Sequence, residues 1–146
     1  MARSASLTSL AVVADTGALY ALLDRDDAWY LRVTEWWMQN RLRVVLPVTI
    51  VPELAYLLGA RLGARAEEAF ARALADREFV LEPLDEADLP RVADLVASYA
   101  DVALGVTDAS VVAIAERLGA AAILTTDRRH FGAVRPRHVP AFRLLP

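Results

Sequence analysis

The sequence has 146 residues, close to the usual length of one domain, and contains no cysteine, which excludes a disulfide framework and a thiolate metal site. Hydrophobic residues make up 56% of the chain, enough for a sizeable core, yet no apolar run approaches the ~20 residues that a membrane-spanning helix needs. The net charge of -3 argues against simple, strongly basic nucleic-acid binding. We therefore expect a single domain over residues 1–146 with no membrane association, and a cytoplasmic location as the default.

The predicted elements alternate between short apolar runs and segments of helical periodicity, which indicates an α/β fold with a mainly parallel sheet. In chain order we predict a strand at Leu10–Ala14, helices at Gly17–Leu23 and Asp27–Asn40, a strand at Val44–Leu46, a helix that contains Leu54 and ends near Gly59, a helix at Gly63–Asp76, a strand at Phe79–Leu81, helices at Asp85–Tyr99 and Thr107–Leu118, and strands at Ala121–Thr125 and Phe142–Leu145. Glycine is favoured just past helix ends, which is why Gly59 is taken as a stop.

Four acidic residues fall where the chain leaves a strand or enters a helix. Asp15 follows the first predicted strand, and Asp127 follows the strand Ala121–Thr125. Asp108 opens a helix, and Glu53 lies in the first turn of another. In open α/β sheets ligands bind beyond the carboxyl ends of the strands, so we expect these carboxylates to converge there.

Each of these acids alone has an ordinary explanation as a helix cap or a turn residue. Together, converging carboxylates repel one another, so that either one is protonated or a cation is present. Oxygen ligands favour Mg²⁺ or Mn²⁺, and a chain with two His and no Cys is a poor candidate for the usual zinc site. Such a centre suits phosphodiester hydrolysis, since the metal activates water and orients phosphate. The sequence does not distinguish a site that binds one ion from a site that binds two.

The basic residues are unevenly distributed. All 16 are arginine, and no acidic residue follows Asp127. Arg128, Arg129 and His130 come directly after it, and we predict that they bind phosphate groups. A compositional bias that replaces lysine by arginine explains the same pattern. The distribution of charge therefore does not distinguish a phosphate-binding end of the chain from an ordinary solvated surface.

Four stretches of the sequence together resemble the PIN domain family, and in particular the VapC-like toxin ribonucleases of bacterial toxin–antitoxin pairs. They are VVADTGALYALLDRDD, VTIVPELAYLL, YADVALGVTDASVVAIAERLG and AILTTDRRHF, which span residues 12–131 in the order found in the family. The resemblance implies a three-layer α/β/α sandwich with a mainly parallel central sheet, and a Mg²⁺- or Mn²⁺-dependent endoribonuclease. It also implies an RNA substrate, whose phosphates Arg128, Arg129 and His130 would bind. A homodimer is implied as well, and so is a small antitoxin that blocks the site, often with an Arg or Lys near the carboxylates.

Carried over by position, the resemblance gives each acidic residue a role. Asp15 and Asp108 match the principal metal ligands, and Asp127 matches a fourth acidic position that often contacts the metal through water. Glu53 matches a glutamate that helps to hold the metal and activate water. The supporting residues that it implies are Asp101, as an auxiliary acid, and the hydroxyls of Thr16 and Thr126.

Other interpretations compete with a toxin nuclease. A PIN-like module that binds RNA or protein without cutting, and a PIN nuclease of RNA processing, are the alternatives within the family. A phosphoacceptor receiver domain needs a lysine, which this chain lacks, and a dinucleotide-binding fold needs a GxGxxG motif that is absent after the first strand. A stripe of Trp29, Val33, Trp36 and Trp37 is either part of an antitoxin groove or ordinary core packing.

Overall fold

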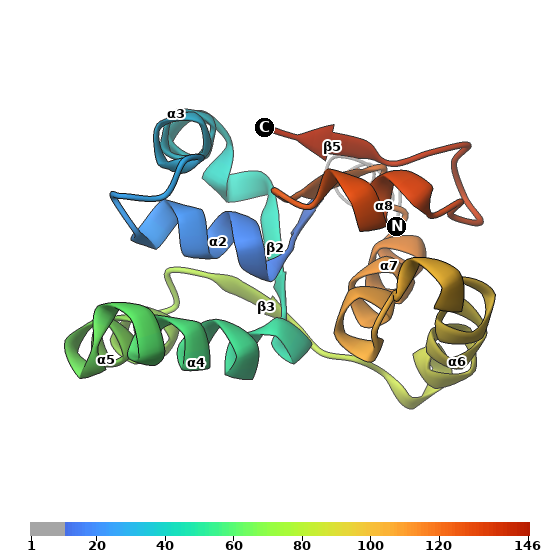
Figure 1. The fold of residues 1–146 in the computed structure, drawn as a ribbon, viewed down its shortest axis with the longest axis horizontal. Helices are drawn as coiled ribbons and strands as arrows, with labels where there is room; N and C mark the ends of the chain where they lie inside the picture. The colour runs from blue at the N-terminus through green and yellow to red at the C-terminus, as the bar shows by residue number, and fades with distance from the viewer. Residues whose placement is uncertain (1–10) are drawn as a thin grey trace, which may run out of the picture.

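A computed structural model describes residues 11–146, and its centre is a five-stranded, fully parallel sheet (Figure 1). The strands are Val12–Ala14 (β1), Val44–Pro47 (β2), Val80–Glu82 (β3), Ala122–Leu124 (β4) and Arg143–Leu145 (β5). Their order is β3-β2-β1-β4-β5, and every neighbouring pair is parallel. The prediction of an α/β fold with a mainly parallel sheet is therefore confirmed, while Leu10, where the first strand was expected to begin, lies outside the described residues.

Helices cover both sides of this sheet. They are Thr16–Leu23 (α2), Tyr30–Asn40 (α3), Val51–Leu62 (α4), Ala64–Ala75 (α5), Leu89–Ser98 (α6), Val106–Leu118 (α7) and Arg128–Ala133 (α8), with short 3-10 turns at Arg41–Arg43 (η1), Val48–Ile50 (η2), Glu86–Asp88 (η3) and Ala100–Val102 (η4). Figure 1 shows α2, α3, α4 and α5 gathered on one side of the strands and α6 and α7 on the other. This is the three-layer α/β/α arrangement that the family resemblance implied.

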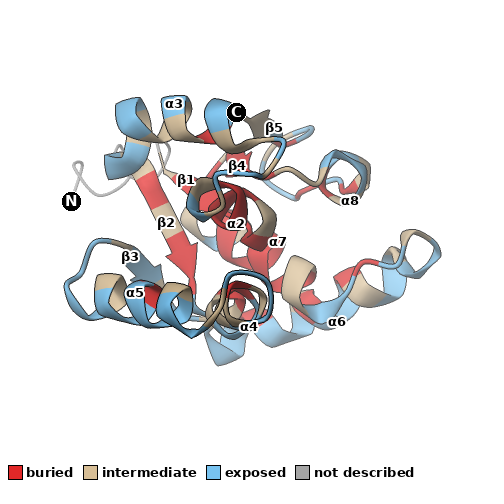
Figure 2. Ribbon diagram, turned by 60° about the vertical axis from the view of Figure 1, so that its left-hand side comes forward, coloured by how far each residue is buried: buried red, intermediate tan, exposed pale blue. Residues whose placement is uncertain are grey.

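The core is built around β1 and α7. All three residues of β1 are completely buried, and α7 is buried continuously from Ala109 to Ala115, so this helix has no solvent-facing stripe over two turns (Figure 2). Such a helix is expected to be apolar on all sides, and Ser110 is the one polar residue in this buried stretch. Because α7 is fixed by packing on every side, the residues of its first turn are held firmly in place. Within the described part of the chain, no helix combines the length and apolar character required to cross a bilayer.

Two predicted helix boundaries are wrong for identifiable reasons. Helix α4 continues through Gly59 to Leu62 and ends at Gly63, whose φ of 96° is favourable only for glycine. Gly59 does not end α4, and a Cβ at this position would lie 2.7 Å from Glu67 Oε2, so the absence of a side chain leaves room for the Glu67 carboxylate. The helix expected at Asp85–Tyr99 is divided into η3 and α6.

The predicted stripe of Trp29, Val33, Trp36 and Trp37, which begins at the residue before α3, lies partly in the core and partly at its edge. Val33 is buried, and the Trp37 ring packs 5.8 Å from that of Phe79. Trp29 lies apart from this packing, with the guanidinium of Arg32 5.3 Å from its ring centre. Core packing therefore explains Val33 and Trp37, and we expect Trp37→Ala to cost stability.

Candidate active site

The topology of the sheet brings two of the acidic residues together. The chain runs outward from β1 to β2 and β3 on one side, and to β4 and β5 on the other, so a topological switch point lies between β1 and β4. Asp15 directly follows β1, and Asp127 follows β4 after two threonines. The carboxyl ends of strands at a switch point form the crevice in which ligands bind in open α/β folds.

Asp15 is a buried carboxyl group, with 6% of the residue exposed. Its backbone N–H donates to the Leu124 carbonyl at 2.9 Å, and its Oδ2 accepts a hydrogen bond from Thr125 Oγ1 at 3.1 Å. Burial, followed by the negative charge of Asp108, raises the pKa of Asp15 from 3.8 to about 7. A carboxyl group with such a pKa is only partly ionised at neutral pH, and a nearby cation would favour its charged form.

Thr125 links Asp15 to Asp127. Its hydroxyl donates to Asp15 and also accepts from the backbone N–H of Asp127 at 2.9 Å, and the residue is completely buried. The family resemblance pointed instead to Thr126, whose Oγ1 lies against Gly17, 2.6 Å from where a Cβ would stand. Among the described contacts, Thr125 is the threonine that bonds to Asp15.

Asp108 lies in the first turn of α7, where the helix dipole favours a negative charge. Burial raises its pKa, and the charges of Asp127 and Glu53 raise it further, while His130 lowers it. These mutual influences show that Asp15, Asp108, Asp127 and Glu53 share one electrostatic environment. The structure therefore brings Asp15, Asp108 and Asp127 within reach of one another's charge, and Glu53 acts on this group through Asp108.

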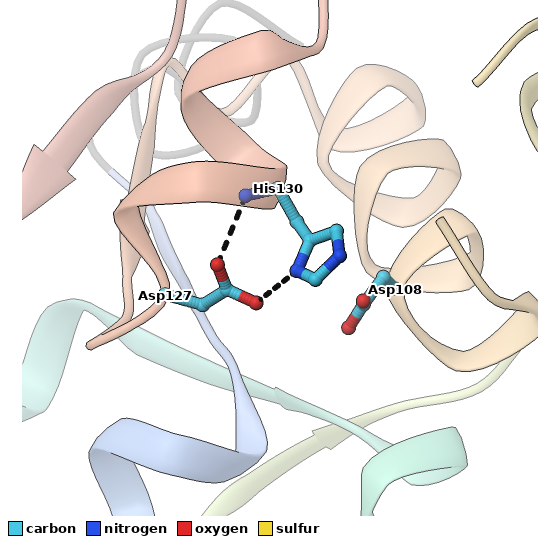
Figure 3. Close-up of side chains that lie close together, drawn as sticks. All are labelled: Asp108, Asp127 and His130. Carbon is cyan, nitrogen blue, oxygen red and sulfur yellow. Dashed lines mark hydrogen bonds and ion pairs between the residues drawn. The ribbon is translucent and has the colours of Figure 1, made fainter. Parts of the chain in front are cut away.

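Asp127 caps α8 and is held by His130 (Figure 3). Its Oδ1 accepts from the His130 backbone N–H at 2.9 Å, and its Oδ2 lies 2.6 Å from His130 Nδ1. The hydrogen bond to Asp127 raises the pKa of His130. Asp108, Asp127 and His130 each offer a ligand atom, and these atoms lie within 4.8 Å of one another. His130, predicted as a phosphate contact, is thus placed among the acids themselves.

The remaining predicted residues are not members of the group formed by Asp108, Asp127 and His130. Glu53 is exposed in the first turn of α4, and Thr16, at the start of α2, is buried with no hydrogen-bond partner for its Oγ1 among the described residues. Asp101 is exposed in η4, where its Oδ1 accepts from the Val102 N–H at 3.1 Å.

The two arginines after Asp127 differ in their surroundings. Arg128 donates to the carbonyls of Leu144 at 3.0 Å and Pro146 at 2.6 Å, and its guanidinium lies 5.4 Å from the centre of the Trp29 ring. Arg129 is exposed on α8. The guanidinium of Arg128 therefore holds residues 144–146 in place by hydrogen bonds, and Arg129 is the better placed of the two to bind a phosphate group.

The donors at this site fit a divalent cation. Carboxylate oxygens from Asp15, Asp108 and Asp127 are hard ligands, and the imidazole of His130 adds a borderline one. Burial, and after it the charges of neighbouring carboxylates, raises the pKa values of Asp15 and Asp108, so a cation at this site would offset both effects. The unpartnered hydroxyl of Thr16, next to Asp15, is a further buried polar group that a bound ligand or water would satisfy.

Comparisons with known proteins identify the family. A family model described as PIN domain matches residues 12–135. Ribonuclease VapC26 of Mycobacterium tuberculosis (strain ATCC 25618 / H37Rv) is 35% identical over 135 residues, which cover 92% of this chain and 100% of VapC26.

Solved structures share the fold at lower identity. VapC20 of Mycobacterium tuberculosis, a toxin that cleaves the sarcin–ricin loop, matches with a TM-score of 0.78 and 19% identity over 89% of this chain and 99% of its own. DNA-bound VapBC of Salmonella typhimurium matches at 0.68 with 18% identity, and FitAcB of Neisseria gonorrhoeae at 0.66 with 20% identity; each match covers 92% of this chain and 96% of the other. The chain therefore belongs to the PIN domain family, among its VapC-like toxin ribonucleases, as the four sequence stretches indicated.

Proposed function

We propose that this VapC-like ribonuclease is an endoribonuclease that depends on Mg²⁺ or Mn²⁺ and uses the carboxylates around Asp15 as its catalytic centre. The observation that carries the proposal is the meeting of Asp15, Asp108 and Asp127 at the switch point of the sheet, with the pKa of Asp15 raised to about 7. Protein side chains that repel one another at a crevice favour a cation there.

Asp15 and Asp108 are the residues that would hold the metal, because the family resemblance gives them that role and because burial disfavours their charges, which a cation would offset. Both oxygens of Asp127 already lie within hydrogen-bond distance of His130 nitrogens, which suits a supporting position at the edge of the site. When bound, the metal would make water more acidic and neutralise charge on the phosphate.

Glu53 is the residue that we assign to proton transfer. It is exposed, so water and substrate can reach it, and its charge acts on Asp108. In hydrolysis, water attacks phosphorus, the bond from phosphorus to the leaving oxygen breaks, and Glu53 takes the proton that the water loses. A solvent water returns a proton to the leaving oxygen.

The decisive experiment is cleavage of a mixed RNA pool by the purified protein with Mg²⁺, Mn²⁺ or EDTA. Cleavage should require the metal and fall at least 100-fold, as an order-of-magnitude expectation for loss of a ligand, in Asp15→Asn and Asp108→Asn. Glu68→Gln is the matched control, because this carboxylate is 62% exposed and pairs only with its helical neighbour Arg72 among the contacts described. A DNA pool of the same sequences tests the preference for RNA.

Absence of cleavage with every metal, from folded protein free of a co-purified inhibitor, would favour the non-cutting binding module. Cleavage that survives in Asp15→Asn and Asp108→Asn would place the catalytic centre elsewhere.

We further propose a small antitoxin as partner and a homodimer as the assembled form. Both rest on the resemblance to VapC-like toxins, and VapBC and FitAcB among the similar structures support the first. An antitoxin encoded beside this chain should abolish cleavage, and replacing its Arg or Lys nearest the carboxylates should restore it. Light scattering on the purified protein tests the dimer, and a monomer mass at all concentrations would exclude it.

A further inference from the structure

Two hydroxyl groups join the segment that carries Glu53 to the helix that carries Asp108. Thr49 Oγ1 lies 2.6 Å from Ser110 Oγ, and Ser110 Oγ donates to the Thr107 carbonyl at 2.6 Å. A serine hydroxyl has a single hydrogen, so the hydrogen between the two hydroxyls must come from Thr49. Hydrogen bonds thus run in one direction from Thr49 to Ser110 and on to the backbone beside Asp108.

Apolar packing alone does not account for this pair. Ser110 is completely buried, and its neighbours Ala109 and Val111 are as well. A buried hydroxyl costs free energy unless it is hydrogen-bonded, and an alanine or valine would avoid the cost altogether. Ser110 keeps its bond to the Thr107 carbonyl in any case, whereas the bond from the half-buried Thr49 to Ser110 exists only while η2 and α7 keep their present separation, so it ties the two elements together.

The position of the pair connects it to the catalytic acids. Thr49 lies in η2, which passes without interruption into α4, and Glu53 follows four residues later in the first turn. Ser110 lies two residues after Asp108 on α7, and its hydroxyl donates to the carbonyl of Thr107, the residue before Asp108. The charge of Glu53 already acts on Asp108, so a change in their separation alters the site directly.

We propose that Thr49 and Ser110 are positioning residues that set the distance between Glu53 and Asp108. Neither hydroxyl reaches the substrate; Thr49 acts through Glu53, and Ser110 acts through Asp108. The inference rests on the proposed function, since it assigns to this pair the placement of a proton acceptor and a metal ligand. Catalysis is sensitive to such placement, and a displacement of about 1 Å can lower rates 100-fold.

The test compares Thr49→Val, which keeps the shape and loses the hydroxyl, with Thr49→Ser, which keeps the hydroxyl. We expect Thr49→Val to lower kcat for RNA cleavage about tenfold with KM within about twofold, and to weaken Mn²⁺ binding, measured by calorimetry, about fivefold. Thr49→Ser should restore both. Thr34→Val is the matched control, because the buried Thr34 hydroxyl has no hydrogen-bond partner among the described residues.

A double-mutant cycle separates positioning from general weakening of the fold. If Thr49 acts through Glu53, Thr49→Val should cost little more once Glu53→Gln is present, whereas a loss of folded protein would add to any background. Wild-type values of kcat and Mn²⁺ affinity in Thr49→Val, or equal losses in both backgrounds, would overturn the inference. A wild-type protein that neither binds Mn²⁺ nor cleaves RNA would instead contradict the proposed function.

Discussion

At the scale of single residues, Asp15 has the least ordinary environment in the described chain. It is buried, accepts a hydrogen bond from Thr125, and faces the charge of Asp108. Its pKa of about 7 exceeds the ordinary value of 3.8, so the folded protein holds this proton more tightly than the unfolded chain does. Ionisation of Asp15 therefore opposes folding in the absence of a cation.

The sign of this linkage gives a prediction for Asp15→Asn. The metal-free wild type should be most stable, with respect to this group, below pH 3.8 and lose that contribution as the pH rises to about 7. Asparagine does not ionise and keeps an oxygen that accepts from Thr125. Asp15→Asn should therefore match the wild type near pH 4 and exceed it by a few kcal/mol, on an order-of-magnitude estimate, at pH 8.

Urea unfolding at a series of pH values with EDTA measures the difference. Repeating it with Mg²⁺ is the control, because a cation stabilises ionised Asp15 and should favour the wild type at pH 8. A constant difference between the two proteins from pH 4 to pH 8 would show that Asp15 ionises normally.

The acidic residues were predictable because position along the chain decides where they lie. Asp15 and Asp127 follow strands that are neighbours in a parallel sheet, and Asp108 and Glu53 begin helices, so topology alone brings them to one edge. Thr125 was not predicted, because the choice between two adjacent threonines depends on which of them faces Asp15. That choice is a matter of strand register, which a one-residue shift reverses.

At the scale of elements, the short helix α8 shows how a site residue can also be structural. This helix was not predicted, because Arg128–Ala133 is too short to show an apolar period. It exists because Asp127 caps it, with Oδ1 accepting from the His130 N–H at 2.9 Å. The same carboxylate thus begins a helix and contributes charge to the metal site.

Two substitutions of Asp127 separate these roles. Asn caps helices as well as Asp, while Ala removes the cap at a cost of about 1 kcal/mol. We expect Asp127→Ala to lower the free energy of unfolding by about that amount and Asp127→Asn by less than half of it, while both lower metal-dependent cleavage about tenfold or more. Chemical unfolding and cleavage rates are the two measurements. Full cleavage by Asp127→Asn would mean that capping is the residue's only task.

The boundaries that prediction missed belong to contacts between elements. Gly59 was taken as a helix end, yet its lack of a side chain serves the approach of Glu67 on the next helix. Nothing in the local sequence distinguishes these two uses of glycine. The parallel sheet and the helix at α7, in contrast, were predictable from short apolar runs and from a long helical stretch rich in apolar residues.

At the scale of the whole molecule, the basic end of the chain is largely used within the protein. Arg128 donates to the carbonyls of Leu144 and Pro146, Arg135 donates to those of Gly132 and Val134, and Arg137 lies 3.8 Å from Asp94. These contacts explain how a run of sequence without acidic residues can fold onto a protein of net charge -3. Fewer residues of this basic end are therefore available to bind RNA than the sequence predicted.

Arg129 is the residue in this end that we expect to contact an RNA phosphate. It is exposed and lies two residues after Asp127, whereas Arg128 is bound to the end of the chain. Each phosphate contact to a single strand contributes about 0.7 to the slope of log affinity against log salt. Arg129→Ala in the Asp15→Asn background, which should not cut RNA, is therefore expected to lower that slope by about 0.7, as measured by fluorescence anisotropy between about 50 and 200 mM salt.

Arg128→Ala is the matched variant. It should keep the slope and lower the melting temperature, because it removes the hydrogen bonds that hold the last strand. An unchanged slope in Arg129→Ala, or a reduced slope in Arg128→Ala, would reverse the assignment and place the phosphate on the guanidinium beside Trp29.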